Sequence, residues 1–437
     1  MSLKQPKILV FTISSWNSKV GANTWATLLE DYGSENVANI CIRDEIPDSP
    51  VCSRYFYISE NKILKSIFNR KIKTGQEVKP LQECEIDVNK DLAEHKLRYQ
   101  KYGAKRRYSL LMVRELAWKL GEWKTKELDA FLEEFQPDII LYSLEGYIHF
   151  NRLVRYAIAK TGARAVGYVW DDNFTYKQSK KLGYKFYRYF QRKSLKKLAK
   201  KTSEFFAITP KTKREADAFF GIDCTVLSKP LNALPIAENY AKANKPLKML
   251  YTGNLGIGRD KTLAKLSSVL KEINKDEKNI LLDVYTQTVL SEEYLREAQH
   301  EFCNIYSAIP QKEVLQKQKD ADVLLFLEDL TDSNLTARLS FSTKITDYLS
   351  TGKCIFAIGN ADLAPIEYFV NTNSAIVIDN EQEILQGLQR LLNKETLRYF
   401  SKNSAECGIA NHNMEYIRKT FDEVLNRAYK AVAKEGK

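Results

Sequence analysis

The sequence contains no apolar run long enough to cross a membrane as a helix. Its longest apolar stretches, residues 139–144 and 323–327, have the length of a strand, whereas a spanning helix needs about 20 apolar residues. The apolar stretch 7–13 is also too short for the core of a signal peptide, and we predict a first strand there. These absences favour a cytoplasmic protein without membrane spans.

Cysteine is present but forms no pattern. The seven cysteines are an odd number and no two of them form a C-x-x-C pair, so neither a disulfide framework nor a structural zinc site is expected. Scattered thiols of this kind fit a reducing cytoplasm.

Signatures of nucleic-acid binding are also lacking. The net charge of +12 admits three explanations, which are a solvated basic surface, an anionic lipid partner and a nucleic acid. Because no zinc finger, RNP-like aromatic pattern or helix-turn-helix appears, we expect no nucleic acid partner.

The 437 residues are too many for one ordinary core, so two domains are expected. Two segments read as strand, glycine turn and helix. The first has a strand at 8–13 and a helix from about 23 to 30, and the second has a strand at 249–252 and a helix from about 261 to 270. This order begins a doubly wound parallel sheet, so we predict an α/β protein with two Rossmann-like domains that face a cleft.

The domain boundaries follow from changes in pattern. We assign 1–232 to an N-terminal domain that carries a basic insertion at about 60–110. Residues 233–245 form a polar linker, and 246–412 form a second domain. The terminal segment 413–437 reads as a helix with an apolar stripe.

A phosphate site is predicted in the second domain, at residues 341–358. A short helix there starts at Ser342 or Thr343, both of which are good N-cap residues, and a helix N-terminus offers N–H donors to an anion. Lys344 adds a full positive charge in the first turn. Asp347 lies on the same face and suits a hydroxyl-bearing group such as ribose.

The glycine turn at residues 253–258 is the second strong signal. Glycines after a strand let the backbone approach a ligand closely, and Arg259 and Lys261 stand at the entrance of the next helix. The spacing is not that of a dinucleotide fingerprint, and the following strand, which leads into Thr286, ends without the acidic residue that binds ribose there. Nicotinamide binding is therefore disfavoured. The alternative is a tight turn with solvated charges.

These motifs resemble those of GT-B glycosyltransferases of the family-4 type. Residues 341–353 are similar to the family form SK-hydrophobic-x-E-Y-L-x-x-G-K, with Asp347 in place of Glu, and residues 251–261 resemble the start of the donor domain. The resemblance covers most of 246–400. It implies a UDP- or GDP-type nucleotide-sugar substrate and no cofactor. It also implies that 246–412 bind the nucleotide sugar, that 1–232 form the acceptor-side domain, and that the helix 413–437 crosses back to that first domain. It places the donor at Gly253, Asn254, Gly256, Arg259, Lys261, Thr286, Ser342, Thr343, Lys344 and Asp347.

The resemblance fails at one position. The family motif has a second Glu eight residues before the one that Asp347 replaces, and this sequence has Leu339 there, which cannot hydrogen-bond a sugar. Glu328, Asp329 or Asp332 would have to supply the lost carboxylate. Retention of the anomeric configuration is favoured over inversion.

The acceptor side is assigned to the first domain. Trp170 and Asn173 flank Asp171 and Asp172 at the end of a strand, where open α/β sheets bind ligands, so either aspartate is a candidate general base. The alternative is an Asx turn or helix cap. His149, near the end of the strand 139–142, is a further catalytic candidate, although a lone surface histidine is the plainer interpretation. Gly21, with Lys19 nearby, is expected to face the cleft.

A basic and aromatic segment at residues 176–201 suits an anionic membrane surface, and residues 62–73 show the same chemistry. The alternative is an amphipathic helix that packs its stripe inward. Together these observations favour a cytoplasmic glycosyltransferase, peripheral to the inner face of the cell membrane, that acts on a glycan or lipid-linked acceptor in surface polysaccharide assembly.

No metal is expected in the reaction, because the one D-x-D, Asp320-Ala-Asp322, precedes its strand rather than ending it. Two other functions remain open. Leu339 motivates a non-catalytic GT-B-like subunit that binds a glycan or a partner enzyme. A sugar-nucleotide epimerase on the same fold would act on the donor alone.

Overall fold

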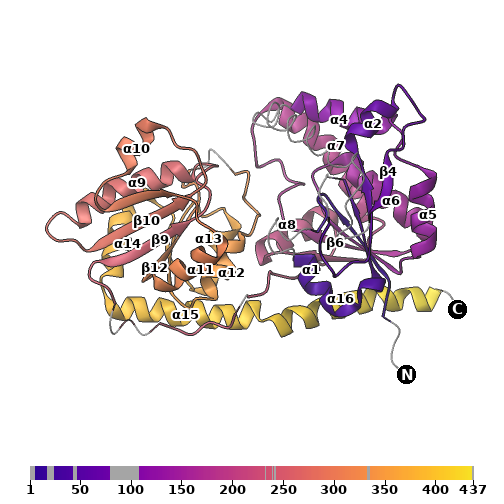
Figure 1. The fold of residues 1–437 in the computed structure, drawn as a ribbon. Coiled ribbons are helices and arrows are strands. Elements are labelled where there is room, and N and C mark those ends of the chain that lie inside the picture. Colours follow the sequence, from indigo (N-terminus) through magenta and orange to yellow (C-terminus); the bar gives the residue numbers. More distant parts are fainter. Residues whose placement is uncertain are drawn as a thin grey trace. The chain divides into compact units, whose positions relative to one another are not determined.

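The computed structural model describes residues 5–16, 24–42, 47–78, 108–231, 233–238, 240, 243–331 and 335–435, without the side chains of 431–435. The chain forms two compact α/β units (Figure 1). The first comprises Met1–Ala207, Lys213–Val226 and Arg418–Lys437, and the second comprises Ile208–Thr212 and Leu227–Ile417. Gly21, Lys19, Asp332 and much of the predicted basic insertion lie outside the described residues.

The first unit is built on an eight-stranded sheet in the order β4-β3-β2-β1-β5-β6-β7-β8. All strand pairs are parallel except β3 with β4. The strands are β1 (Ile8–Thr12), β2 (Val37–Cys41), β3 (Arg54–Ile58), β4 (Gly75–Val78), β5 (Ile139–Ser143), β6 (Arg164–Val169), β7 (Glu204–Ala207) and β8 (Thr225–Val226).

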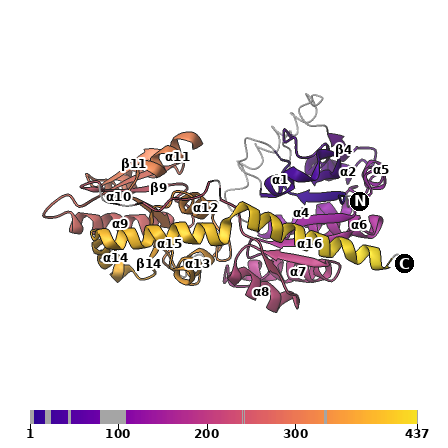
Figure 2. The same cartoon turned by 90° about the horizontal axis from the view of Figure 1, so that it is seen from below.

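Helices cover both faces of this sheet (Figures 1 and 2). They are α1 (Thr24–Leu29), α2 (Glu60–Ser66), α4 (Tyr108–Leu120), α5 (Lys126–Phe135), α6 (Ile148–Thr161), α7 (Leu182–Ala199) and α8 (Pro210–Phe220). Helices α4, α6 and α7 pack against one another.

The second unit has a six-stranded, fully parallel sheet in the order β11-β10-β9-β12-β13-β14. The strands are β9 (Leu247–Thr252), β10 (Ile280–Thr286), β11 (Cys303–Ser307), β12 (Val323–Leu327), β13 (Cys354–Ile358) and β14 (Ile376–Ile378). The helices are α9 (Arg259–Ile273), α10 (Glu292–Ala298), α11 (Gln311–Asp320), α12 (Thr343–Leu349), α13 (Ala364–Thr372), α14 (Ile384–Leu391) and α15 (Lys394–His412).

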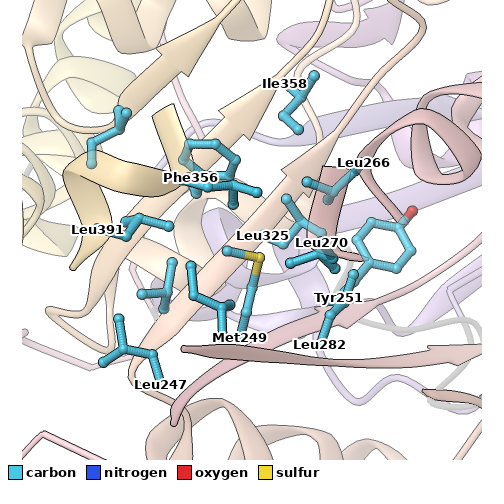
Figure 3. Close-up of a cluster of buried hydrophobic side chains, with 14 of the residues drawn as sticks. Leu247, Met249, Tyr251, Leu266, Leu270, Leu282, Leu325, Phe356, Ile358 and Leu391 are labelled. Atoms are coloured by element: carbon cyan, nitrogen blue, oxygen red, sulfur yellow. The ribbon is translucent and has the colours of Figure 1, made fainter. Parts of the chain in front are cut away.

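The core of the second unit follows from the two-residue period of its strands. In β12, Val323, Leu325 and Leu327 point to one face, where they meet side chains of α9 and α14 (Figure 3). Leu324 and Phe326 point to the other face and meet α12 and α13. A strand that is apolar at every position is expected where helices cover both faces of a parallel sheet, which is why residues 323–327 form an uninterrupted apolar run.

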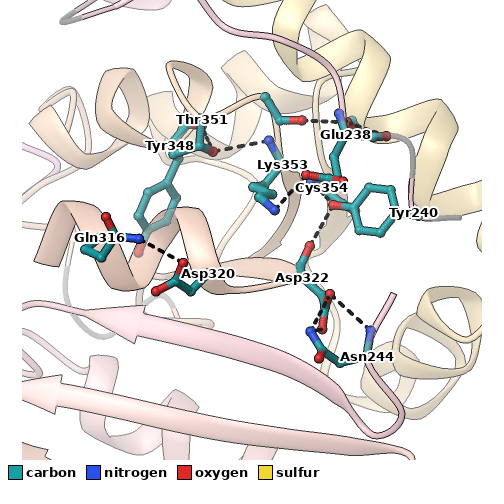
Figure 4. Close-up of polar contacts among 12 residues, drawn as sticks. Glu238, Tyr240, Asn244, Gln316, Asp320, Asp322, Tyr348, Thr351, Lys353 and Cys354 are labelled. Carbon is teal, nitrogen blue, oxygen red and sulfur yellow. Dashed lines mark hydrogen bonds and ion pairs between the residues drawn. The ribbon is translucent and has the colours of Figure 1, made fainter. Parts of the chain in front are cut away.

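The predicted linker 233–245 packs on the second unit where it is described (Figure 4). The Tyr240 hydroxyl donates to the Asp322 carbonyl oxygen at 2.6 Å and accepts from the Cys354 N–H at 2.8 Å. The Asp322 carboxylate accepts from Asn244 and from the Lys248 N–H. Asp322, one of the two aspartates of the D-x-D, therefore fixes the entry to β9.

The last helix, α16 (Met414–Glu435), begins in the second unit and contributes Arg418–Lys437 to the first. Phe421 is fully buried, and its ring lies 5.8 Å from that of Phe206 and 6.0 Å from that of Trp25. The Tyr32 hydroxyl donates to Asp422 at 2.6 Å. The terminal segment thus completes the core of the first unit.

The prediction of two Rossmann-like α/β domains is confirmed by the two parallel-rich sheets. Within the described ranges, no helix combines the length and the apolarity that crossing a bilayer requires.

Candidate functional site

The second sheet reverses its strand order between β9 and β12, which are neighbours. Ligands of open α/β sheets bind at such a point, beyond the carboxyl ends of the strands. Gly253 directly follows β9 and Glu328 directly follows β12. The glycine turn, which carries several of the predicted donor residues, therefore lies at the position in the sheet that best suits a ligand.

The glycine turn keeps its backbone open. Gly253 has φ 143° and Gly258 has φ 85°, which side chains disfavour, and even Ile257 adopts φ 63°. A Cβ on Gly253 would collide with the Lys344 side chain, whose Cε would lie only 2.9 Å away. The Gly253 position is therefore restricted both by its backbone and by the lysine packed against it.

The turn is held by hydrogen bonds to the end of β10. The Gly253 N–H donates to the Tyr285 carbonyl oxygen at 2.9 Å. The Asn254 side-chain oxygen accepts from the Gly256 N–H at 2.5 Å and from the Thr288 hydroxyl at 3.2 Å. Thr286 is buried, and its hydroxyl accepts from the Thr288 N–H. Asn254, Gly256 and Thr286 thus shape the turn.

Arg259 forms a two-pronged ion pair with Glu328. Its Nε and Nη2 donate to the two carboxylate oxygens at 3.0 and 2.8 Å, and Nε also donates to the Leu327 carbonyl oxygen at 3.1 Å. The side chains are only 14% and 6% exposed. The pair raises the pKa of Arg259 against the opposing effect of burial. Glu328 orients the guanidinium and leaves its Nη1 edge for a ligand.

Lys344 brings a second positive charge to the same place. Its Nζ donates to the Tyr251 hydroxyl at 3.2 Å and lies 4.4 Å from the centroid of the Tyr251 ring. Burial, followed by the nearby charge of Arg259, lowers the pKa of Lys344 to about 8, while Glu328 opposes the shift. Two cations held together at partial desolvation are costly without an anion between them. This cost favours an anionic ligand at the site.

The helix α12 carries the remaining predicted donor residues. Ser342 is its N-cap and makes no side-chain cap hydrogen bond, and Thr343 is exposed. Asp347 is half-buried, and its carboxylate lies 3.6 Å from Lys229 Nζ. This lysine partner was not predictable from the sequence, because it comes from a segment more than a hundred residues away. Lys261 is exposed in the first turn of α9.

Leu339 is fully buried in the second unit, and its carbonyl oxygen accepts from the Thr212 hydroxyl at 3.2 Å. The position where the family has a carboxylate is thus part of the packed interior. Of the three proposed substitutes, Glu328 is engaged by Arg259 and Asp329 is buried beside Gly258, where it accepts from the Thr331 N–H at 2.8 Å. Asp332 lies outside the described residues.

The predicted acceptor-side residues follow β6 in the first unit. Asp172 is fully buried, and its carboxylate accepts from the N–H and the hydroxyl of Thr175, three residues on, which is a local side-chain contact that holds the loop after β6. The Asn173 amide donates to the Leu144 carbonyl oxygen at 2.8 Å. Trp170 lies with its ring 5.4 Å from that of Tyr168. Asp171 is half-buried and remains the more accessible aspartate.

His149 is neither at the surface nor open to a ligand. It is 1% exposed, its ring stacks on Trp118 at 4.4 Å, and its Nδ1 lies 3.1 Å from Glu115. Glu115 also accepts from the N–H groups of Ile148 and His149 at the start of α6. Burial lowers the pKa of His149, and the neighbouring Glu115 opposes this shift. The geometry gives His149 a packing role, because no surface reaches its ring.

Metal ligands do not gather at this site. Among the described residues, no cluster of three or more His, Cys, Asp or Glu side chains could hold an ion. Asp320 accepts from Gln316 at 2.9 Å at the end of α11, and Asp322 fixes the linker (Figure 4).

Comparison with known proteins rests on structure alone, since no family model and no curated protein matches the sequence. The trehalose-6-phosphate synthase of Burkholderia multivorans superposes with a TM-score of 0.59 at 9% identity, over 98% of each chain. The UDP-forming trehalose-phosphate synthase of Burkholderia xenovorans gives 0.55 at 12% identity, over 96% of this chain and 99% of the other.

The lipopolysaccharide outer core galactosyltransferase WaaB gives a TM-score of 0.55 at 14% identity, over 96% of this chain and 99% of its own. These structures are GT-B glycosyltransferases. The chain has the GT-B fold. The GT-B resemblance stated from the sequence motifs is confirmed at the level of the fold, and in this GT-B chain the glycine turn, Arg259 and Lys344 lie in the second Rossmann-like unit.

Proposed function

We propose that the protein is a glycosyltransferase that uses a nucleotide-sugar donor. The observation that carries the proposal is the meeting of Gly253, Arg259 and Lys344 at the switch point of the second sheet. An open glycine backbone beside two oriented cations suits a diphosphate, whose negative charge grows as the sugar leaves.

In the proposed reaction, the bond between the anomeric carbon and the diphosphate oxygen breaks, and a bond from that carbon to an acceptor hydroxyl forms. Arg259 and Lys344 stabilise the departing nucleoside diphosphate, and a base removes the proton of the acceptor hydroxyl. Asp347 would exchange its contact with Lys229 for a ribose hydroxyl. For retention, the acceptor hydroxyl attacks from the face that the diphosphate leaves, so an oxygen of the departing diphosphate is the proposed base, and Asp171 is proposed to bind the acceptor. We propose metal independence, because the two cations serve the diphosphate, and retention of the anomeric configuration.

The donor and acceptor classes are inferred from chemistry and from the structural neighbours. One neighbour is UDP-forming and another is a lipopolysaccharide galactosyltransferase. The first neighbour supports UDP-sugars as the first donors to test, with GDP-sugars next. The second supports a glycan or lipid-linked acceptor in surface polysaccharide assembly. We propose a cytoplasmic location at the inner face of the cell membrane.

A panel of nucleotide sugars tests the proposal. Thermal stabilisation by one donor, with slow release of the nucleoside diphosphate in water, is expected. Chelation by EDTA should leave that release unchanged, and the anomeric proton of the transferred sugar in NMR would report retention or inversion. The absence of nucleotide binding at millimolar concentration would refute the proposal that the protein is a glycosyltransferase.

A second candidate is a non-catalytic GT-B subunit, which the buried Leu339 favours. It predicts nucleotide or glycan binding without donor cleavage. An epimerase would instead convert the donor with no acceptor present. Measuring nucleotide release and donor isomerisation in the same samples separates the three.

A further inference from the structure

Helix α4 leaves an aliphatic stripe exposed. It buries Ala117 and Trp118 together with Glu115, while Leu110, Val113 and Leu116 are 44%, 61% and 53% exposed. These leucines and the valine recur every three residues and so share one face of the helix. Within the described part of the chain this face is an uncovered apolar surface, and covering it would be favourable.

Helix α7 also leaves apolar side chains exposed. It buries Leu195 and Leu198 together with the polar side chains of Arg188, Gln191 and Ser194, while Leu182 and Phe186 are 83% and 58% exposed. Tyr189, 53% exposed, continues the apolar face along the helix. Part of the aromatic stripe predicted from the sequence does pack inward, as Tyr184 and Tyr187 do. The remaining part faces solvent.

The two apolar faces belong to neighbouring helices (Figure 1). The rings of Tyr108 and Tyr184 lie 5.7 Å apart, and the Tyr187 hydroxyl lies 3.3 Å from Glu115, so α4 and α7 run side by side. We name the surface formed by Leu110, Val113, Leu116, Leu182, Phe186 and Tyr189 the α4–α7 ridge.

The exposed face of α7 becomes more basic along the helix. After Tyr189 and Phe190, the exposed positions are Lys193, Lys196, Lys197 and Lys200. Lys193 and Lys197 form none of the ion pairs found among the described residues. Exposed apolar side chains next to a row of lysines match the boundary of an anionic bilayer, where the apolar groups enter and the lysines meet headgroups.

We propose that the α4–α7 ridge docks on an anionic membrane. Charge complementarity favours this occupant over a second copy of the chain, because two copies would bring two lysine rows together. The proposal does not rest on the glycosyltransferase function. It depends only on the exposed apolar side chains of the ridge and on the lysines next to them. Donor chemistry in the second unit can fail while the ridge still binds lipid.

Flotation of the full chain with lipid vesicles tests the proposal. The unmodified protein should float with vesicles that contain phosphatidylglycerol, should not float with phosphatidylcholine alone, and should be released by high salt. The double variant Leu116→Gln/Phe186→Gln and the double variant Lys193→Glu/Lys197→Glu should each weaken binding roughly tenfold or more. Both positions of each pair are exposed, so the fold should be kept.

Matched controls remove exposed groups elsewhere. Val370→Gln changes a side chain that is 56% exposed on α13, and Lys271→Glu/Lys275→Glu makes the same charge change in the second unit. Both should bind vesicles as the unmodified protein does. Nucleotide affinity should be unchanged in all four variants.

Three outcomes would overturn the proposal. One is no binding of the unmodified protein to anionic vesicles. Another is unchanged binding by the ridge double variant. The third is a dimer, seen by sedimentation, that the ridge double variant converts to a monomer, because the ridge would then be a contact between copies.

Discussion

At the scale of single residues, the two cations of the proposed donor site differ in what stabilises them. Arg259 is already paired with Glu328. Lys344 packs its amino group against Gly253 and Tyr251, and burial and the charge of Arg259 disfavour its own charge. A bound anion would stabilise the charge of Lys344, which is why we assign a ligand to this place.

Replacing Gly253 by Ala should weaken nucleotide diphosphate binding at least tenfold, because the new Cβ displaces the Lys344 side chain. The matched control is Gly162→Ala, at φ 72°, where no atom lies within 4 Å of the new Cβ. Each variant should lose roughly 1 kcal/mol of stability from backbone strain. Calorimetric titration with nucleoside diphosphates checks the affinity, and equal affinities in the two variants would contradict the role of Gly253.

The two cations should differ in their effect on stability. Lys344→Met removes a desolvated charge, so the free energy of unfolding should stay the same or rise by roughly 1 kcal/mol. Arg259→Met leaves Glu328 buried without its partner and should cost roughly 3 kcal/mol. Denaturant unfolding measures both. Donor turnover should fall in each variant, and a large loss of stability in Lys344→Met would contradict the assignment.

Lys344 also predicts a pH dependence. Since its pKa is lowered to about 8, the amino group loses its charge as pH rises through 8, and nucleotide diphosphate affinity should fall above that pH. Stability should move the other way. Between pH 8 and the ordinary lysine value, the unfolded chain binds more protons, so the free energy of unfolding rises with pH.

Titrations of affinity and stability against pH, run beside Lys344→Met, isolate this group. The variant should lack both trends. An unmodified protein whose affinity is flat from pH 7 to 10 would refute the charged role of Lys344.

At the scale of elements, the strands and the glycine turn at 253–258 were predictable because their signals are local. The helix expected at about 261–270, after the second glycine turn, is α9 at Arg259–Ile273. The helix expected at about 23–30 is α1 at Thr24–Leu29. Contacts between distant segments were not predictable. The Arg259–Glu328 and Lys229–Asp347 pairs join residues brought together only by the sheet order. The exposed aliphatic stripe of α4 was missed, because an apolar stripe in the sequence does not show whether another element covers it.

The element α16 carries its own prediction. Phe421 fills the space between Trp25 and Phe206 in the first unit, so Phe421→Ala should lower the free energy of unfolding by roughly 3–5 kcal/mol. Glu423→Ala, at an exposed position of the same helix, should change it by less than about 0.5 kcal/mol. Thermal unfolding of the two variants checks this. Similar small effects would mean that α16 is dispensable to the first unit.

At the scale of the whole molecule, the two units present two different kinds of surface. The second unit gathers cations at its switch point, and the first unit exposes the apolar and basic α4–α7 ridge. A protein that holds a diphosphate in one unit and a membrane surface with the other would suit transfer of a sugar to a lipid-linked acceptor. The binding of the diphosphate is the central claim, since every catalytic proposal depends on it.

The most direct test of that claim is calorimetric titration of the unmodified protein, Lys344→Met and Gly162→Ala with UDP and GDP. The account predicts micromolar-to-millimolar binding of at least one nucleotide, unchanged in Gly162→Ala and weakened tenfold or more in Lys344→Met. Equal binding by all three proteins, or no binding of either nucleotide by the unmodified protein, would contradict it.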